Sequence, residues 1–199
     1  MNILVTGGAG GIGSTLCLLL KKNGHNVYAL DNLNNGYMKN LQENGEQFCN
    51  FIYADIRDTD VIANVIHSKD IDVVVHLAAL TSLPVCESDP SECIDVNVAG
   101  TTSILDAARQ YGIKVICAST SAIYENIPKE KAPFVEFLPV QPRLFYPLSK
   151  KLMEEVIQSY IDNYDMDIIT LRFFNVFGPR QDIHRKSPPL INYIVRQIK

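Results

Sequence analysis

Two side chains with complementary chemistry, Tyr146 and Lys150, lie four positions apart in the sequence YPLSK. At the start of a helix, residues at this spacing project from the same face, about one turn from each other. A phenol with a pKa of about 10 is a poor base at neutral pH, but a neighbouring ammonium favours its phenolate form. The pair is therefore a candidate acid/base centre. Taken alone, the same spacing also occurs on solvent-exposed helices that do no chemistry.

Three hydroxyl side chains precede this pair: Ser119, Thr120 and Ser121, directly after the apolar run 115–118. If that run is a strand of a parallel sheet, its carboxyl end faces the crevice in which such sheets bind their ligands. A hydroxyl there could hold the reacting oxygen of a substrate. The same hydroxyls could instead cap the end of the strand or bond to their own loop.

A glycine-rich turn, TGGAGGIG at positions 6–13, follows the first apolar run. Glycine lets the backbone turn tightly and approach a pyrophosphate closely, and the helix that follows presents N–H groups and a favourable dipole. The candidate cofactor contacts in this turn are Gly7, Gly10, Gly11, Ile12 and Gly13. Glycine-rich turns also join strands to helices without binding anything, so this reading depends on further positions.

Acidic residues end the next two apolar runs. Asp31, followed by Asn32, is placed where a carboxylate accepts hydrogen bonds from the adenosine ribose and repels a 2′-phosphate, which favours NAD over NADP. Asp55, followed by Ile56, could meet the adenine amino group. Alternatively, Asp31 is a turn residue, and the acidic group at Asp55 belongs to a helix N-cap, which Asp58 alone would explain.

The elements that must position these residues alternate in kind along the chain. Runs rich in β-branched residues predict strands at 2–6, 26–30, 48–54, 72–76, 115–118 and 168–171. Apolar residues at helical spacing predict helices at 12–22, 59–67, 91–110 and 148–163, and a last one from 188–189 to the end. The proline-rich segment 129–147 predicts a long loop. This alternation predicts an α/β fold with a Rossmann-type, doubly wound parallel sheet.

Composition argues against several other classes of protein. With 47% hydrophobic and 20% charged residues, the chain can bury a core, and a net charge of -4 with scattered basic residues argues against nucleic-acid binding. The five cysteines lack metal-site spacing, so we expect buried free thiols and no metal. The chain shows neither a signal-peptide pattern nor an apolar run long enough to span a bilayer. We therefore expect a cytoplasmic protein without a membrane partner.

Eight segments resemble motifs of the extended short-chain dehydrogenase/reductase family, in particular its nucleotide-sugar epimerases and dehydratases. They are GGAGGIG at the first turn, DNLNNG after strand 26–30, DIRD after strand 48–54, HLAA at 76–79, DVNVAGT at 95–101, ASTSAIY at 118–124, YPLSK at 146–150 and LRFFNVFGPRQ at 171–181. Each motif is weak alone, but their order and spacing are specific. The resemblance covers essentially the whole chain and implies NAD as the cofactor.

The resemblance also implies residue roles. Tyr146 would be the catalytic acid/base, and Lys150 would also hold the nicotinamide ribose. Counting back four positions from Tyr124 selects Thr120 as the catalytic hydroxyl, with Ser121 as the second candidate. The further NAD contacts that it implies are Leu77, Ala78, Ala79, Asn97 and Ser119. Asn97 would stabilise the helix that carries it, although these positions could equally be ordinary packing.

Substrate and partners follow from the same resemblance. The substrate would be a nucleotide-diphosphate sugar, most simply a UDP-hexose. Asn175 and Arg180 would contact its diphosphate; alternatively, Asn175 satisfies loop backbone and Arg180 is a surface charge. Family members commonly pair two long helices in a homodimer, and helices 91–110 and 148–163 would correspond to them.

The implied reaction is oxidation and re-reduction of the sugar. Tyr146, assisted by Thr120, would take the proton of a sugar hydroxyl while hydride passes to NAD, giving a transient keto sugar. Family dehydratases and decarboxylases usually carry an acidic residue just after the catalytic hydroxyl, whereas Ser121 and Ala122 stand here. Epimerisation at C4 is therefore the leading reaction. The alternatives are a 4,6-dehydratase or decarboxylase, and an NAD-binding module without catalysis.

The chain departs from the family pattern in two ways. Glu125 follows Tyr124 where the family normally has glycine, which predicts a different path for the next loop. Family members are also usually longer, with a C-terminal region that closes over the sugar nucleotide. We therefore assign residues 1–175 to a Rossmann domain with the catalytic residues and residues 176–199 to the start of a truncated substrate-binding region, the C-terminal substrate domain being largely missing.

Overall fold

The structure, a computed structural model, describes residues 1–181, 188 and 190–198. Residues 182–187 and 199, and Pro189 at the predicted start of the last helix, lie outside the described residues. In chain order, the elements are β1 (Asn2–Thr6), α1 (Gly11–Lys22), β2 (Asn26–Asp31), β3 (Gln42–Glu43), β4 (Glu46–Gln47), β5 (Asn50–Tyr53), α2 (Thr59–Ser68), β6 (Val73–His76), α3 (Leu83–Ser88), α4 (Pro90–Ile94), α5 (Gly100–Tyr111), β7 (Lys114–Thr120), α6 (Phe145–Tyr164), β8 (Ile168–Phe173) and α7 (Leu190–Ile198).

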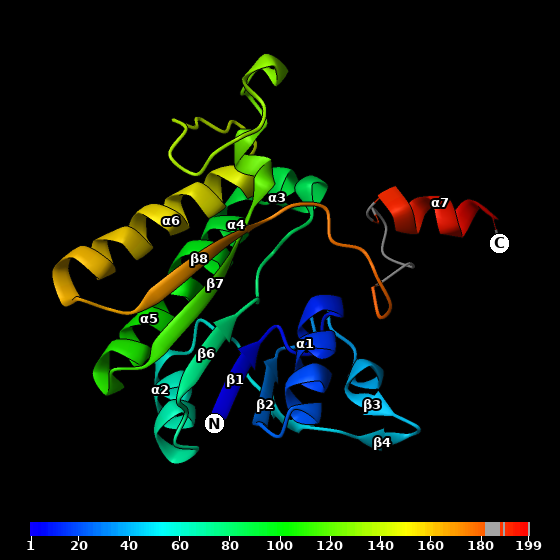
Figure 1. Ribbon diagram of the computed structural model, residues 1–199, viewed down its shortest axis with the longest axis vertical. Helices are drawn as coiled ribbons and strands as arrows, with labels where there is room; N and C mark the ends of the chain where they lie inside the picture. The colour runs from blue at the N-terminus through cyan, green and yellow to red at the C-terminus, as the bar shows by residue number, and fades with distance from the viewer. Residues whose placement is uncertain (182–187, 189, 199) are drawn as a thin grey trace.

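Six strands form one parallel sheet in the order β5-β2-β1-β6-β7-β8 (Figure 1). Thr6, at the end of β1, pairs with Leu30 of β2 on one side and with His76 of β6 on the other. The carboxyl ends of these three strands are therefore level, and the strand order reverses between β1 and β6. In doubly wound sheets, ligands bind at this reversal. The predicted α/β fold with a Rossmann-type parallel sheet is confirmed.

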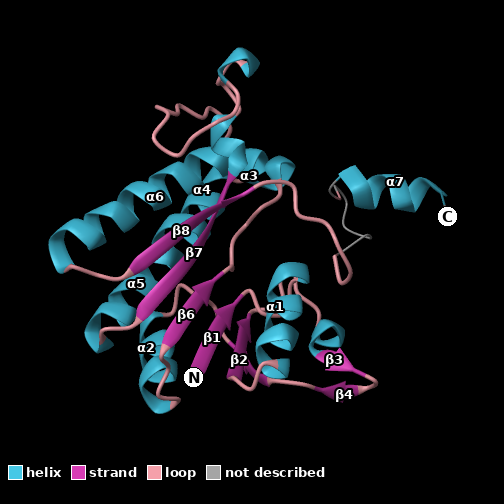
Figure 2. Cartoon of the chain, viewed as in Figure 1, coloured by secondary structure: helices cyan, strands magenta, loops and turns pink. Residues whose placement is uncertain are grey.

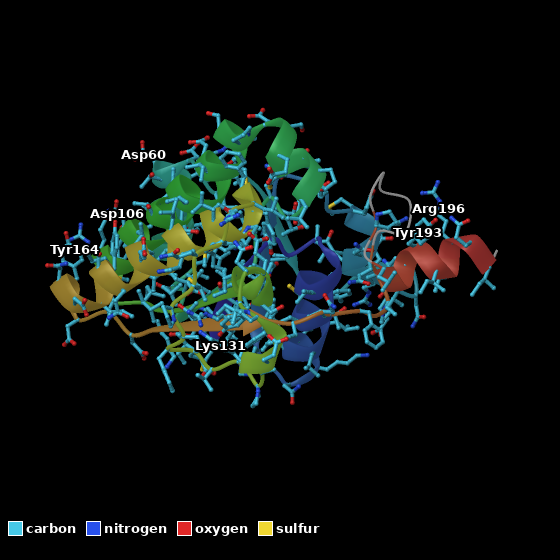
Figure 3. All side chains as sticks on the ribbon, turned by 90° about the horizontal axis from the view of Figure 1, so that it is seen from above. Asp60, Asp106, Lys131, Tyr164, Tyr193 and Arg196 are labelled. Atoms are coloured by element: carbon cyan, nitrogen blue, oxygen red, sulfur yellow. The ribbon has the colours of Figure 1, made fainter. Side chains whose placement is uncertain are left out.

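Helices pack on both faces of the sheet (Figure 2). On one face, α2, α5 and α6 lie side by side, and Figure 3 labels Asp60, Asp106 and Tyr164 on them. Their apolar side chains bury a core with β1 and β6 that includes Leu4, Ile104 and Met153. On the other face, α1 packs against β1 and β2 in a second core. Burial on both faces explains why β1 and β2 read as almost continuous apolar runs, whereas Ile169 and Leu171 of β8 are exposed on one face.

The helix predicted at 91–110 is a composite. It runs as α4, a π-helical segment at Asp95–Ala99, and α5, which is followed by Gly112 in the left-handed conformation. A π-segment adds a residue to one turn and is found mostly at functional sites. Asn97 lies in this segment.

The short elements that were not predicted include helix α3, the small hairpin of β3 and β4, and the single helical turn at Met38–Leu41. Helix α7 begins at Leu190 and carries Tyr193 and Arg196, which lie at the opposite end of the molecule from Tyr164 (Figure 3). Among the described residues, none of the helices has the length and apolarity that crossing a membrane requires.

Candidate active site

The glycine-rich turn leaves β1 at the point where the strand order reverses. Gly7 has a φ of +66°, and a Cβ on it would lie 2.8 Å from the backbone nitrogen of Ala78. Both the left-handed backbone and this close contact exclude a side chain at this position. Helix α1 begins after Gly10 without a capping side chain and without an acidic residue in its first turn. In contrast, the side chain of Asp58 caps α2. The uncapped end of α1 suits an anion such as a pyrophosphate.

Asp31 lies at the end of β2, beside the glycine-rich turn. Its carboxylate accepts hydrogen bonds from the backbone N–H groups of Ala9 (3.0 Å) and Leu33 (2.8 Å). Burial raises the pKa of Asp31 above its usual value, and these two bonds oppose that rise. A carboxylate can accept about four hydrogen bonds. Asp31 therefore holds the turn in shape and keeps acceptor capacity for a pair of hydroxyls.

Asp55 is engaged in a charged cluster. Arg57 binds its two oxygens through Nε and Nη2, both at 2.9 Å, and the amide of Asn32 donates to it at 3.1 Å. The guanidinium holds the pKa of Asp55 well below its usual range. Ile56 is buried in the core, so its side chain faces away from the crevice edge. As the alternative reading supposed, Asp58 is the N-cap of α2.

Asn97 connects the π-segment to the loop after β6. Its Oδ1 accepts from the Leu80 N–H at 2.7 Å, and its Nδ2 donates to the Leu80 carbonyl at 2.9 Å and to Ser149 Oγ at 2.9 Å. Asn97 is 1% exposed. It fixes the loop at Leu80, directly after Leu77, Ala78 and Ala79, relative to helix α6.

His76 closes a buried chain of hydrogen bonds across the crevice floor. The Thr101 hydroxyl donates to the Asn97 carbonyl, so its oxygen accepts from His76 Nε2 at 3.0 Å. The other ring nitrogen, Nδ1, then accepts from the Thr6 hydroxyl at 2.7 Å. Thr6 Oγ1 in turn accepts from the N–H groups of Leu77 and Ala78, both at 3.2 Å. Each member is satisfied when His76 is neutral with its proton on Nε2.

Burial, together with the Lys150 ammonium, lowers the pKa of His76 to about 3. A depressed histidine pKa means that the unfolded chain binds a proton between pH 6.5 and 3 that the folded chain does not. Folding stability is therefore lost as the pH falls through this window. We expect His76→Asn to lower the free energy of unfolding at pH 7. Between pH 7 and pH 5, however, the free energy of unfolding should fall by about 2 kcal/mol less in this variant than in the parent chain.

Urea unfolding at several pH values measures this difference, with His25→Asn as the control because His25 lies outside the buried chain. Equal pH dependence in the parent chain and in the His76 variant would contradict a buried neutral His76.

Helix α6 begins at Phe145, three residues before the predicted start at 148, and Tyr146 and Lys150 lie in its first two turns. Lys150 is 3% exposed, and its Nζ donates to the Ala118 carbonyl of β7 at 2.9 Å. Burial lowers the pKa of Lys150 to about 8, and nearby Cys117, Cys93 and Glu154 oppose that shift. Tyr146 packs beside Leu80 and its neighbouring cysteines. The ammonium is therefore desolvated and points at the end of the strand that carries the hydroxyls.

Two glutamates hold the start of α6: Glu125, noted in the sequence only as a departure from the family pattern, and Glu87, which the sequence did not single out. Glu125 Oε1 accepts from the N–H groups of Arg143 at 2.6 Å and Leu144 at 3.0 Å, and Glu87 Oε1 accepts from Phe145 N–H at 2.6 Å. Carboxylates at a helix N-terminus satisfy otherwise unpaired N–H groups and favour the dipole. Glu125, where the family normally has glycine, thus pins the loop that delivers Tyr146.

The three hydroxyls take different roles. Thr120 ends β7 at 8% exposure, and its Oγ1 accepts from the Ala122 N–H at 3.1 Å. Ser119 is 4% exposed and donates to Glu154 at 2.5 Å. Ser121 begins the helical turn Ser121–Tyr124 and is half-buried. Part of the alternative reading therefore holds, because Thr120 does cap its own loop, while its hydroxyl hydrogen remains available for donation.

The segment after β8 leads across to α1 (Figure 1). Asn175 is exposed in this segment. Arg180 lies against α1, where its Nη1 donates to the Ser14 carbonyl at 3.2 Å and its guanidinium stacks over Phe48 at 5.4 Å. Arg180 therefore sits beside the glycine-rich turn, with a φ of +68°. Within the described part of the chain, no group of three His, Cys, Asp or Glu side chains could hold a metal ion.

The fold and this site define a Rossmann-type dinucleotide-binding protein with a Tyr–Lys pair at the carboxyl edge of its sheet. The model of the NAD dependent epimerase/dehydratase family matches residues 3–199. The chain belongs to this family, and the resemblance to extended short-chain dehydrogenases/reductases is confirmed.

Known proteins resemble the chain along almost its whole length. A putative UDP-glucose 4-epimerase of Methanocaldococcus jannaschii is 37% identical over 99% of this chain and 63% of that protein. The structure of a Thermotoga maritima UDP-glucose 4-epimerase with UDP-glucose has a TM-score of 0.92 at 29% identity, covering 99% of this chain and 62% of its own. A Thermus thermophilus UDP-glucose 4-epimerase in complex with NAD has a TM-score of 0.85 at 36% identity, covering 94% and 59%. The chain thus spans less than two thirds of each of these relatives.

Proposed function

We propose that this chain carries the NAD-binding and catalytic part of a nucleotide-sugar 4-epimerase. The observation that carries the proposal is the position of Lys150. Its buried ammonium joins the helix of Tyr146 to the strand end of Thr120, at the edge of the sheet where ligands bind. A packing role alone would not call for a buried cation at this place, because burying a charge is costly.

The glycine-rich turn, Asp31 and the loop after β6 fit NAD. The uncapped start of α1 would hold the pyrophosphate, and Asp31 would accept from the adenosine ribose. Lys150 would bind the nicotinamide ribose, with Ser119 nearby. Asn32, Asp55, Ile56 and Asn97 complete the proposed set, with Asn97 acting by fixing the loop rather than by direct contact. Bound NAD would supply a hydride acceptor and donor for the sugar carbon.

The residues of the chain would handle the proton. Tyr146 would take the proton from the sugar hydroxyl and later return it, while the Thr120 hydroxyl holds the same sugar oxygen. The Lys150 ammonium favours the phenolate form of a tyrosine one helical turn away. With a pKa of about 8, Lys150 stays largely charged at neutral pH and can play this part.

The residues after the catalytic hydroxyl favour epimerisation over dehydration. Ser121 and Ala122 follow Thr120, so a second acid or base is not supplied at these positions. We propose a UDP-hexose as the substrate, since the relatives described above are named for UDP-glucose. Asn175 and Arg180 are the proposed contacts to its diphosphate, and Arg180 would reach it from beside α1.

We further propose the domain division at residue 175, a homodimer and a cytoplasmic location. Helices α5 and α6 lie side by side on one face of the sheet and are the proposed dimer surface. All five cysteines are buried free thiols, which suits a reducing compartment. Light scattering tests the homodimer, because it measures whether the mass of the particle in solution is twice that of one chain.

The test of the proposal is a turnover assay. UDP-galactose is incubated with the chain and NAD, and the products are followed by chromatography. Formation of UDP-glucose supports a 4-epimerase, and loss of water from the sugar would support a dehydratase instead. NAD binding with no conversion of this or other sugar nucleotides would favour a binding module without catalysis.

A further inference from the structure

Glu154 lies on α6 one turn beyond Lys150, and its carboxylate makes three bonds. Oε1 accepts from Ser119 Oγ at 2.5 Å and from Arg172 Nε at 3.0 Å, and Oε2 accepts from Arg172 Nη2 at 2.7 Å. The side chains of Glu154 and Arg172 are only 13% and 18% exposed. Arg172 therefore binds Glu154 through two parallel hydrogen bonds, and the Ser119 hydroxyl adds a third. Two-bond pairs of this kind between arginine and a carboxylate are stronger and more closely defined in geometry than single-bond pairs.

Lys150 and Glu154 together join α6 to two successive residues of β7. Lys150 Nζ reaches the Ala118 carbonyl at 2.9 Å, and Glu154 takes the Ser119 hydroxyl. Thr120 is the next residue along the strand. Tyr146 and Thr120 lie on different elements, so their separation depends on how firmly these two clamps hold.

Arg172 extends the clamp to the neighbouring loop. Its Nη1 donates to Tyr124 Oη at 2.7 Å and to the Glu136 carbonyl at 2.7 Å. The guanidinium also lies over the Tyr124 ring, 5.3 Å from its centroid. The carboxylate of Glu154 is therefore the joint between α6, β7, β8 and the loop that follows Tyr124.

We propose that Glu154 is a positioning residue of the catalytic centre: it holds the strand end that carries Thr120 against the helix of Tyr146, and it places a negative charge one helical turn from Lys150. This inference rests on the proposed function for its catalytic meaning. Its structural content, an influence of Glu154 on Lys150, can be measured without turnover.

The environment of Lys150 includes groups from each element packed around it. Cys117 comes from β7, Cys93 from α4, His76 from β6 and Glu154 from α6 itself. The Cys117 thiol and the His76 imidazole carry no charge at neutral pH, because burial raises the pKa of Cys117 to about 12 and lowers the pKa of His76 to about 3. Glu154 is therefore the carboxylate in this set whose removal changes the field at Lys150.

The test is an NMR titration of Lys150 in chain labelled with 13C at the lysine ε position, with Lys150→Arg to assign the signal. Glu154→Gln keeps an acceptor for Ser119 but removes the charge, and we expect it to lower the pKa of Lys150 by roughly one unit. The matched control is Glu155→Gln, which removes the same charge from the next residue. Glu155 pairs with Lys151 and is 59% exposed, so its loss should leave the pKa of Lys150 unchanged.

Ser119→Ala separates the clamp from the charge. It should leave the pKa of Lys150 unchanged and lower kcat about tenfold at an unchanged KM, since Ser119 would not bind the sugar nucleotide. If Glu154→Gln does not fold, the kcat of Ser119→Ala carries the test, because that variant removes the bond to the strand end and keeps both charges; an unchanged kcat then overturns the inference. A pKa of Lys150 that stays at the wild-type value in the Glu154 variant overturns the inference. If Glu154→Gln lowers the pKa of Lys150 as expected but the parent chain binds no NAD, the inference stands and the proposed function is contradicted.

Discussion

Gly13→Ala is expected to destabilise the fold by roughly 3 kcal/mol or more and to abolish NAD binding. A Cβ at this position would lie 2.2 Å from the Gly7 carbonyl oxygen and 2.9 Å from the Cα of Gly8. Both are backbone atoms of the glycine-rich turn, so neither can move aside as a side chain would. Helix α1 would have to shift away from β1, and its N-terminus would leave the position at which it faces a pyrophosphate.

Chemical unfolding and an NAD titration measure the two effects. The control is Gly178→Ala, because a Cβ there meets no atom within 4 Å and its backbone is not left-handed. Its stability should change by less than about 0.5 kcal/mol. A Gly13→Ala chain with parent-like stability and NAD affinity would show that the turn tolerates a side chain and would remove the packing argument.

Tyr146→Phe should lower turnover by a factor on the order of 10² to 10⁴ while changing NAD affinity less than about threefold. The substitution removes one oxygen and keeps the ring in its packing beside Leu80. If Tyr146 moves the proton of the sugar hydroxyl, the loss falls on kcat rather than on the binding of cofactor or substrate.

Tyr160→Phe is the matched control on the same helix. Its hydroxyl donates to Asp106 at 2.9 Å, far along α6 from the strand end. Loss of that bond should cost about 1 kcal/mol of stability and leave turnover unchanged. Full turnover in Tyr146→Phe would contradict the assignment of this residue as the acid/base, whatever the control does.

The strands and the main helices could be predicted because their signals are local. Asn2–Thr6 is an apolar run followed by glycines, and α6 follows from the position of its apolar residues. The helix at 91–110 was predicted as one regular element. A π-segment is set by the tertiary bonds of Asn97 to Leu80 and Ser149, which no local pattern contains.

The candidate site was predictable where a motif carries its own geometry, as the Tyr146 and Lys150 spacing does. The supporting residues were not, because they act across the chain. Glu87 holds the start of α6 from a helix that is distant in the sequence, and Glu154 of α6 meets Arg172 of β8. Arg180 shows the same limit, since its place against α1 depends on the path of the chain after β8.

The central claim is that the carboxyl edge of this sheet binds NAD. The most direct test is to purify the chain under native conditions, denature it, and identify the released small molecules by mass spectrometry, followed by an NAD titration of any empty protein. The account predicts that NAD is released or that NAD binds on titration, with NADP binding at least tenfold more weakly because of Asp31. A folded chain that releases no NAD and does not bind it when titrated would contradict the claim and reduce the glycine-rich turn to a packing feature.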